Sequence, residues 1–429
     1  MKSTFITNWL NNTNRFFFSI YAIIAAFSTY ACMYAFRKPF SVATYSGMEA
    51  FGIDYKTLLI IFQVFGYMLS KIIGIKVVSE AHKNRRAFLI LVLILFGEAS
   101  LFLFSITPIP FNIIFLFLNG LPLGMVWGLV FAYLEGRRLT EVLAAGLSVS
   151  FIVSSGFVKS IGKYVMTDWG VSELNMPFVT GALFLVPLVF FVWLLDHLPP
   201  PDEKDEKLRV KRIPLDKKSR LSMLKQFAFP LTILTIVYVV LAIYRELRDN
   251  FMADIWLAFG YGDIPSLFTL TEIPIAILVL IILGSVMLIK SNFTALISIH
   301  WIILMGAILL GGSSVLLQFQ IISPTAWMIY IGMGLYMGYV PFNCILFDRS
   351  IAAFKLNGNS GFLIYIADSF GYMGSVLVLL YKNFGQANIS WYNFIIFASY
   401  SFSGIIFLFT IISMVYFYRI KLNKIPRRN

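Results

Sequence analysis

The sequence predicts an all-α polytopic membrane protein, from its composition, its apolar runs of bilayer length and the placement of its cations. Of 429 residues, 59% are hydrophobic and only 13% are charged, and the mean hydropathy is +0.82. A soluble protein carries about 25% charged residues, and one soluble core of this length cannot hide so much apolar surface. The net charge of +13 does not indicate a nucleic-acid partner, because the cations lie between apolar runs.

About twelve apolar runs approach the roughly 20 residues that a helix needs to cross a bilayer. The predicted spans are 16–45, 55–79, 86–107, 110–135, 142–165, 176–196, 229–259, 266–289, 293–318, 325–347, 359–383 and 391–418. The longest polar connection lies midway and opens with three prolines at 199–201. We therefore predict an N-terminal six-helix bundle over 1–196, a cytoplasmic linker over 197–228 and a C-terminal six-helix bundle over 229–429.

Lysine and arginine gather in alternate loops, whereas the loops between them are almost free of these residues. The basic loops hold Lys83, Arg85, Arg86, Arg137, Arg138, Lys290, Arg349 and Lys355, together with the central linker and the tail from Lys421. By the positive-inside rule both termini are cytoplasmic, which requires an even number of spans. A short polar lead runs directly into the first span, so we expect an uncleaved anchor in the cytoplasmic (inner) membrane.

The sequence indicates neither a metal site nor an enzyme. Cys32 and Cys344 lie in apolar runs, and the three histidines lack metal-ligand spacing. We find no His-Glu-x-x-His helix, nucleophile elbow or phosphate-cradling glycine loop. We therefore expect no cofactor and no enzymatic activity.

The two halves of the chain echo each other. A pair of glycines four residues apart occurs at 120–124 and again at 334–338. An acidic residue followed by arginine comes next in each half, at 135–138 and at 348–349. Small residues at this spacing allow helices to approach closely. The echo is consistent with a duplicated transporter of two similar halves.

The strongest candidate for a binding site is the end of the first span. If the helix of 16–45 continues with a bend at Pro39, then Tyr30, Tyr34, Arg37 and Ser41 share one polar face. A cation inside the membrane is costly and usually meets a substrate, an ion or a partner. The alternative is a cationic pair that snorkels to the membrane interface.

Lys71 in the second span is a similar candidate, and Tyr67 lies one helical turn away on the same face. A snorkelling lysine is again the alternative. The seventh span holds Arg245, Arg248 and Asp249. Arg245 and Asp249 are four residues apart, so Asp249 can neutralise Arg245 and leave Arg248 for a ligand. The alternative is that these charges only pair with one another.

Two further acids lie within predicted spans. Glu272 and Asp368 can close ion pairs with Arg248 or Lys71 when the site is empty, or can carry a coupling proton.

The run Tyr30-x3-Tyr34-x2-Arg37-Lys-x-Phe40 resembles the organophosphate:phosphate antiporters of the major facilitator superfamily. The resemblance implies that Arg37 binds substrate phosphate, that Tyr30 and Tyr34 line the site, and that Lys71 faces the pore. It also implies a second phosphate ligand in the seventh span, either Arg245 or Arg248, of which we prefer Arg248. The fifth-helix histidine of that family has no counterpart here, because Ser155 and Gly156 occupy the region.

The resemblance implies a major-facilitator-type protein, a bacterial relative of the antiporters. We expect a secondary active transporter, or antiporter, that moves a small anionic solute by alternating access, most simply an organophosphate or phosphate. The expected partners are this solute and membrane lipid, and we expect a monomer. The alternative function is a non-transporting sensor of an organophosphate with the same fold.

Overall fold

The computed structural model describes residues 4–137, 139–201, 217–354, 360–385 and 389–424. Arg138, Lys355, most of the predicted linker and the last residues of the tail lie outside this part of the chain. Up to residue 201 the helices are α1 (Thr4–Asn12), α2 (Arg15–Ala35), η1 (Pro39–Val42), α3 (Tyr55–Glu80), η2 (Lys83–Arg85), α4 (Arg86–Ile106), α5 (Ile113–Leu123), α6 (Val126–Leu134), α7 (Thr140–Ser148), α8 (Ser150–Thr167), α9 (Met176–Leu183) and α10 (Leu185–Asp196).

From residue 217 onward the described chain is again helical. Its helices are α12 (Lys217–Asn250), α13 (Met252–Ala258), α14 (Leu267–Leu270), α15 (Glu272–Met287), α16 (Asn292–Gln318), α17 (Pro324–Cys344), α18 (Leu346–Phe354), α19 (Ser360–Gly385) and α20 (Trp391–Lys424). Helices satisfy their own backbone hydrogen bonds, which is a requirement for any chain that crosses lipid.

The helices confirm the predicted polytopic architecture. Within the described residues, nine helical segments are long and apolar enough to span a membrane, and two bent helix pairs raise the number to eleven. The pairs are α9 with α10, bent by 43°, and α17 with α18, bent by 53°. In addition, α19 has 26 residues, more than the roughly 20 that a span requires. The fold is therefore all-α and polytopic, with about twelve spans as predicted.

Prolines set two of the helix ends. A proline ring clashes with the carbonyl group four residues earlier. Pro39 accordingly follows the end of α2 at Ala35 by four residues, and Pro187 follows the end of α9 at Leu183 by four residues. The predicted first span, 16–45, is therefore wrong in its second part: α2 ends at Ala35, and the chain turns and continues as η1.

A two-stranded hairpin interrupts the helices between the first two spans. Strands β1 (Glu49–Ala50) and β2 (Ile53–Asp54) pair antiparallel. The two connecting residues, Phe51 and Gly52, have φ values of 56° and 71°, the left-handed values that tight hairpin turns require. Asp54 then caps α3, because its carboxylate accepts the backbone N–H of Thr57 at 2.9 Å.

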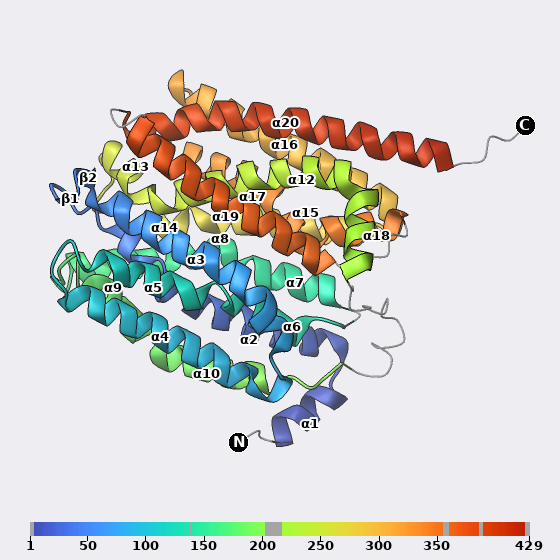
Figure 1. Ribbon diagram of the computed structural model, residues 1–429, viewed down its shortest axis with the longest axis horizontal. Coiled ribbons are helices and arrows are strands. Elements are labelled where there is room, and N and C mark those ends of the chain that lie inside the picture. The colour runs from blue at the N-terminus through green and yellow to red at the C-terminus, as the bar shows by residue number, and fades with distance from the viewer. Residues whose placement is uncertain (1–3, 138, 202–216, 355–359, 386–388, 425–429) are drawn as a thin grey trace, which may run out of the picture. The chain divides into compact units, whose positions relative to one another are not determined.

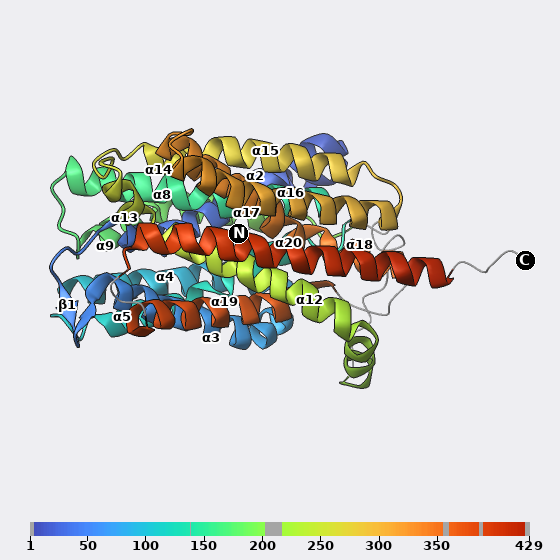
Figure 2. The same cartoon turned by 90° about the horizontal axis from the view of Figure 1, so that it is seen from above.

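The glycine pairs mark close helix contacts, as their spacing predicts. A methyl group on Gly120 would collide with the backbone of α3, and one on Gly66 would collide with the backbone of α5. In the second half, Gly334 of α17 and Gly306 of α16 exclude a side chain in the same way. Figures 1 and 2 show α3 beside α5 and α16 beside α17.

The chain divides into two compact units that do not follow the midpoint. The first unit comprises Met1–Lys211, Glu246–Ala276 and Ser375–Tyr392, and the second comprises Arg212–Arg245, Ile277–Gly374 and Asn393–Asn429. The predicted bundles over 1–196 and 229–429 stay a prediction. The division matters for the site, because Arg245 belongs to the second unit and Arg248 to the first.

Candidate functional site

Seven buried charged side chains of the first unit meet around the turn after α2. We call them the charge cluster: Arg37, Lys38, Lys159, Arg248, Glu246, Asp249 and Glu272. They come from the α2–η1 turn, from α8, from the end of α12 and from the start of α15. Four are cations and three are carboxylates. Segments more than 200 residues apart in sequence thus share one polar centre, for example through Lys38 and Glu246, which are separated by 208 positions.

The end of α2 places two neighbouring cations on this centre. The backbone N–H of Phe36 caps α2 by bonding to the carbonyls of Met33 and Tyr34. Arg37 and Lys38 therefore lie in a turn instead of on a continuous helix face. Each of the two side chains contacts Glu246: Arg37 Nη2 lies 3.7 Å from Oε1, and Lys38 Nζ lies 3.3 Å from Oε2.

Asp249 carries the densest set of contacts. Its Oδ2 lies 2.5 Å from Lys38 Nζ, and its Oδ1 lies 2.5 Å from Lys159 Nζ. Ser155 Oγ donates to the same Oδ1, and Lys159 also donates to the Asp249 backbone carbonyl. Asn250 adds a neutral bridge, because its Oδ1 accepts from Lys38 Nζ at 2.9 Å and its Nδ2 donates to Glu246 at 3.1 Å. One carboxylate thus holds two ammonium groups, one from the α2–η1 turn and one from α8.

Arg248 and Glu272 form the remaining pair of the cluster. Arg248 Nη1 lies 2.8 Å from Glu272 Oε1, and each side chain is 2% exposed. Glu272 can approach because Gly156 of α8 has no side chain: a methyl group there would contact the backbone of Phe268 and the side chain of Glu272. Because the pair is almost fully buried, water screens the attraction between the two charges only weakly. The strength of the pair therefore depends on how the two side chains are positioned.

Aromatic rings extend the cluster toward Lys71. The Arg37 guanidinium lies 3.6 Å from the centroid of the Tyr67 ring, a stacked cation–π arrangement. Lys71 Nζ lies 5.4 Å from the same centroid and 5.7 Å from the Trp127 ring. Arg37 and Lys71 are thus brought to one aromatic side chain. Tyr30 and Tyr34 contact each other edge to face, with centroids 5.4 Å apart, one helical turn before Arg37.

Arg245 and Asp368 belong to a separate cluster in the second unit. Arg245 Nη2 donates to the Tyr372 hydroxyl at 2.8 Å, and its guanidinium lies 4.7 Å from the Tyr339 ring centroid. Tyr238 donates its hydroxyl hydrogen to Asp368 Oδ1, and its hydroxyl oxygen lies 3.1 Å from that of Tyr339. Asp249 instead bonds Lys38 and Lys159, so the expected neutralisation of Arg245 by Asp249 is replaced by these two pairs.

Sequence reasoning did not assign Lys38, Lys159 or Glu246 to the site. Pro39 was the available signal for Lys38, because a helix that stops at Ala35 places both following cations in a turn. Glu246 and Asp249 are three residues apart and so share a helix face. Lys159 had no local signal, since its partner lies 90 residues away.

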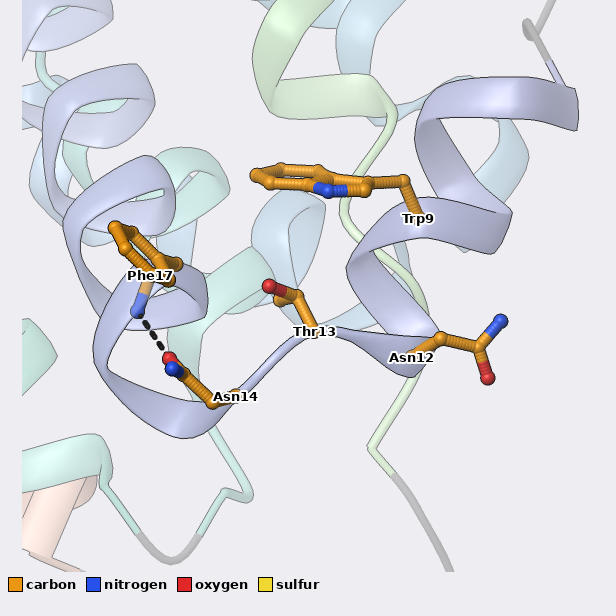
Figure 3. A pocket seen from close by; sticks show the side chains of 5 residues that line it. All are labelled: Trp9, Asn12, Thr13, Asn14 and Phe17. Carbon is orange, nitrogen blue, oxygen red and sulfur yellow. Dashed lines mark hydrogen bonds between the residues drawn. The ribbon is translucent and has the colours of Figure 1, made fainter.

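A pocket near the N-terminus lacks the charged side chains of the cluster. Trp9, Asn12, Thr13, Asn14 and Phe17 line it where α1 meets α2 (Figure 3). The Asn14 side chain is occupied there in capping α2, because it accepts the Phe17 N–H at 3.0 Å. None of the five lining residues is charged, so this pocket is a poor site for an ionic solute.

The described helices form the all-α, polytopic fold of a membrane protein. The structure is similar to the crystal structure of a D-xylose–proton symporter, with a TM-score of 0.61, 12% identity, and 95% of this chain and 98% of that chain covered. It is also similar to the crystal structure of the nucleoside transporter NupG, with a TM-score of 0.60, 12% identity, and 93% and 98% covered. At such identities the likeness shows the fold alone. A comparison with curated proteins gave no match. Residues 39–420 match the Family of unknown function (DUF5690), and the chain belongs to that family.

Proposed function

We propose that the protein is a secondary transporter that moves a small anionic solute across the membrane by alternating access. The observation that carries the proposal is the charge cluster, in which four buried cations meet three buried carboxylates. Buried charges of this kind are expensive to maintain in a membrane and are usually functional. The major-facilitator-type fold supports transport, because the structures it resembles are transporters by their titles.

The cluster offers an anion a set of exchangeable contacts. Arg37 and Lys38 share Glu246, and Arg248 is held by Glu272. An incoming dianion competes with these carboxylates for charge-assisted hydrogen bonds, which the planar arginine fork can make in bidentate form. Releasing Glu246 or Glu272 frees the segment that carries it. Binding is thereby coupled to a rearrangement of α12 and α15 against the α2–η1 turn.

The finer proposal is an organophosphate or phosphate as the solute, with exchange as the mode of transport. Arg37 and Arg248 are the phosphate ligands, Lys71 and Tyr67 extend the site, and Tyr30 and Tyr34 line its approach. We take Arg248 over Arg245 because Arg248 belongs to the same compact unit and the same cluster as Arg37. Asp249 and Glu272 are the internal ion-pair partners that hold the cations before the solute arrives, whereas Asp368 accepts the hydroxyl of Tyr238 in the cluster of the second unit.

The test is binding and uptake with purified full-length protein reconstituted in liposomes. The solutes are phosphate, glycerol phosphate, a hexose phosphate, a dicarboxylate and a neutral sugar. We expect the phosphorylated solutes to bind and to be taken up, and Arg37→Ala to abolish both. Arg85→Ala, at an exposed arginine of η2, is the matched control and should behave as the wild type.

Binding without uptake would favour the sensor over the transporter. If only the neutral sugar binds, the proposal of an anionic solute is wrong, and only the description of the fold stands. Normal phosphate binding by Arg37→Ala would overturn the site.

A further inference from the structure

Glu98 is a buried carboxyl group within the membrane-spanning helix α4, away from the charge cluster. Its side chain belongs to a residue that is 6% exposed, and within the described residues neither carboxyl oxygen has a hydrogen-bond donor. The group packs directly against Gly181 of α9, where a methyl group would collide with Oε2. A glycine at 181 thus leaves a space that the carboxyl group fills.

No described cation faces this carboxyl group. The helices packed against α4 are α5, α6, α9 and α10, and their sequences contain no Lys, Arg or His. Their one acid is Asp196 at the end of α10, which accepts a hydrogen bond from Tyr133 of α6. The cations of η2 and Arg86 lie at the first turn of α4, at least twelve positions from Glu98 (98 − 86), which is about 18 Å along the helix.

An ionised carboxylate without a donor or a cation is very costly inside a membrane, and binding a proton removes that cost. We propose that Glu98 is a reversible proton-binding site and that its proton occupancy controls the turn that carries Arg37. The proton is a second ligand of the protein, distinct from the solute.

A hydrogen-bonded path joins Glu98 to the Arg37 turn. Gly97 is the neighbour of Glu98 in α4, and its backbone carbonyl accepts a hydrogen bond from Asn119 Nδ2 at 2.9 Å. Asn119 Nδ2 also donates to the Phe36 carbonyl at 2.9 Å. Gln63 completes the path by donating to the Arg37 carbonyl at 3.1 Å and to Asn119 Oδ1 at 3.4 Å. A displacement of α4 at Gly97 is therefore felt at the backbone of Phe36 and Arg37.

The sign of the coupling follows from the packing. With its proton bound, Glu98 fits against Gly181 as a neutral group. Loss of the proton puts a charge there that draws in water and separates α4 from α9, which disturbs the Asn119 contacts. Raising the pH should therefore weaken anion binding at Arg37. This coupling rests on the proposed function, whereas the proton site itself does not.

The proton site is tested by infrared spectroscopy of the full-length protein in lipid, titrated between about pH 5 and about pH 9. The C=O stretch of a protonated, buried carboxyl group should be present at acid pH and lost on raising the pH. It should be missing in Glu98→Gln and retained in Glu49→Gln, a control at an exposed glutamate of β1. A Glu98→Gln spectrum with every wild-type carboxyl band, or a Glu98 band that does not titrate, would overturn the proton site.

The coupling is tested with inorganic phosphate as the probe, by measuring its affinity across the same pH range. The wild type and Glu49→Gln should lose affinity at least about fivefold more than Glu98→Gln, which should keep its acid-side affinity. Titration of phosphate itself affects all three proteins alike. A Glu98→Gln profile that follows the wild type overturns the coupling. If the wild type binds no anion at all, the coupling falls with the proposed function, and the infrared band still decides the proton site.

Discussion

Replacing Asp249 by Asn should destabilise the protein more than any other single loss of an acid in its neighbourhood. The Asp249 carboxylate lies 2.5 Å from Lys38 Nζ and 2.5 Å from Lys159 Nζ, and both lysine side chains are 1% exposed. The substitution preserves the shape of the side chain and removes the charge that both ammonium groups share.

Breaking a buried ion pair from one side costs about 3–5 kcal/mol in the free energy of unfolding. Two pairs are broken here, but each lysine keeps another acceptor: Lys38 keeps Glu246 and Asn250, and Lys159 keeps the Asp249 carbonyl. We therefore expect a loss of about 3–5 kcal/mol in total instead of twice that value.

Asp254→Asn is the matched control. Asp254 lies 2.6 Å from Lys56 Nζ, but its side chain is 24% exposed against 12% for Asp249. Water reaches this pair on the Asp254 side only, because Lys56 itself is 2% exposed. The loss should therefore exceed the value of about 1 kcal/mol or less that exposed pairs show, but stay below the loss for Asp249→Asn.

The measurement is reversible denaturant unfolding of each variant in mixed micelles. Lys159→Met added to Asp249→Asn should restore part of the stability, because it removes one of the two cations. Equal losses for Asp249→Asn and Asp254→Asn, or a double variant less stable than Asp249→Asn, would refute the reasoning from burial.

Three further outcomes are expected. Arg248→Ala should abolish phosphate binding while Arg245→Ala retains it, and the reverse result in a binding assay would show that the wrong arginine was chosen. Gly66→Ala should lower the stability by about 1–3 kcal/mol because its methyl group meets the backbone of α5. Gly312→Ala is the control, because open space surrounds it, and it should raise the stability by about 0.5–1 kcal/mol. Equal shifts in the thermal unfolding of the two variants would count against the close contact of Gly66 with α5. Reporter fusions at the C-terminus and within 199–225 should both score as cytoplasmic, and a signal from the opposite side would contradict the positive-inside assignment.

The sequence by itself determined the helices, because the requirement for an apolar run of bilayer length is local. The predicted 86–107 and 293–318 match α4 and α16 to within one residue at each end. The glycine pairs also predicted their own close contacts, since a missing side chain acts wherever two helices meet. Arg37, Lys71 and Tyr67 were identified in the same way, as polar groups out of place in apolar runs, and the structure brings them to one aromatic ring.

Only the tertiary structure decided which charges pair. Asp249 was matched with its helical neighbour Arg245, four residues away, because sequence reasoning sees only contacts within one helix. In the fold Asp249 reaches Lys38 and Lys159, from segments 211 and 90 positions earlier (249 − 38 and 249 − 159). Because α2 ends at Ala35, Lys38 lies in the following turn, where its side chain contacts that carboxylate. The energy of a buried charge depends on the helices packed around it, and no local pattern records their arrangement.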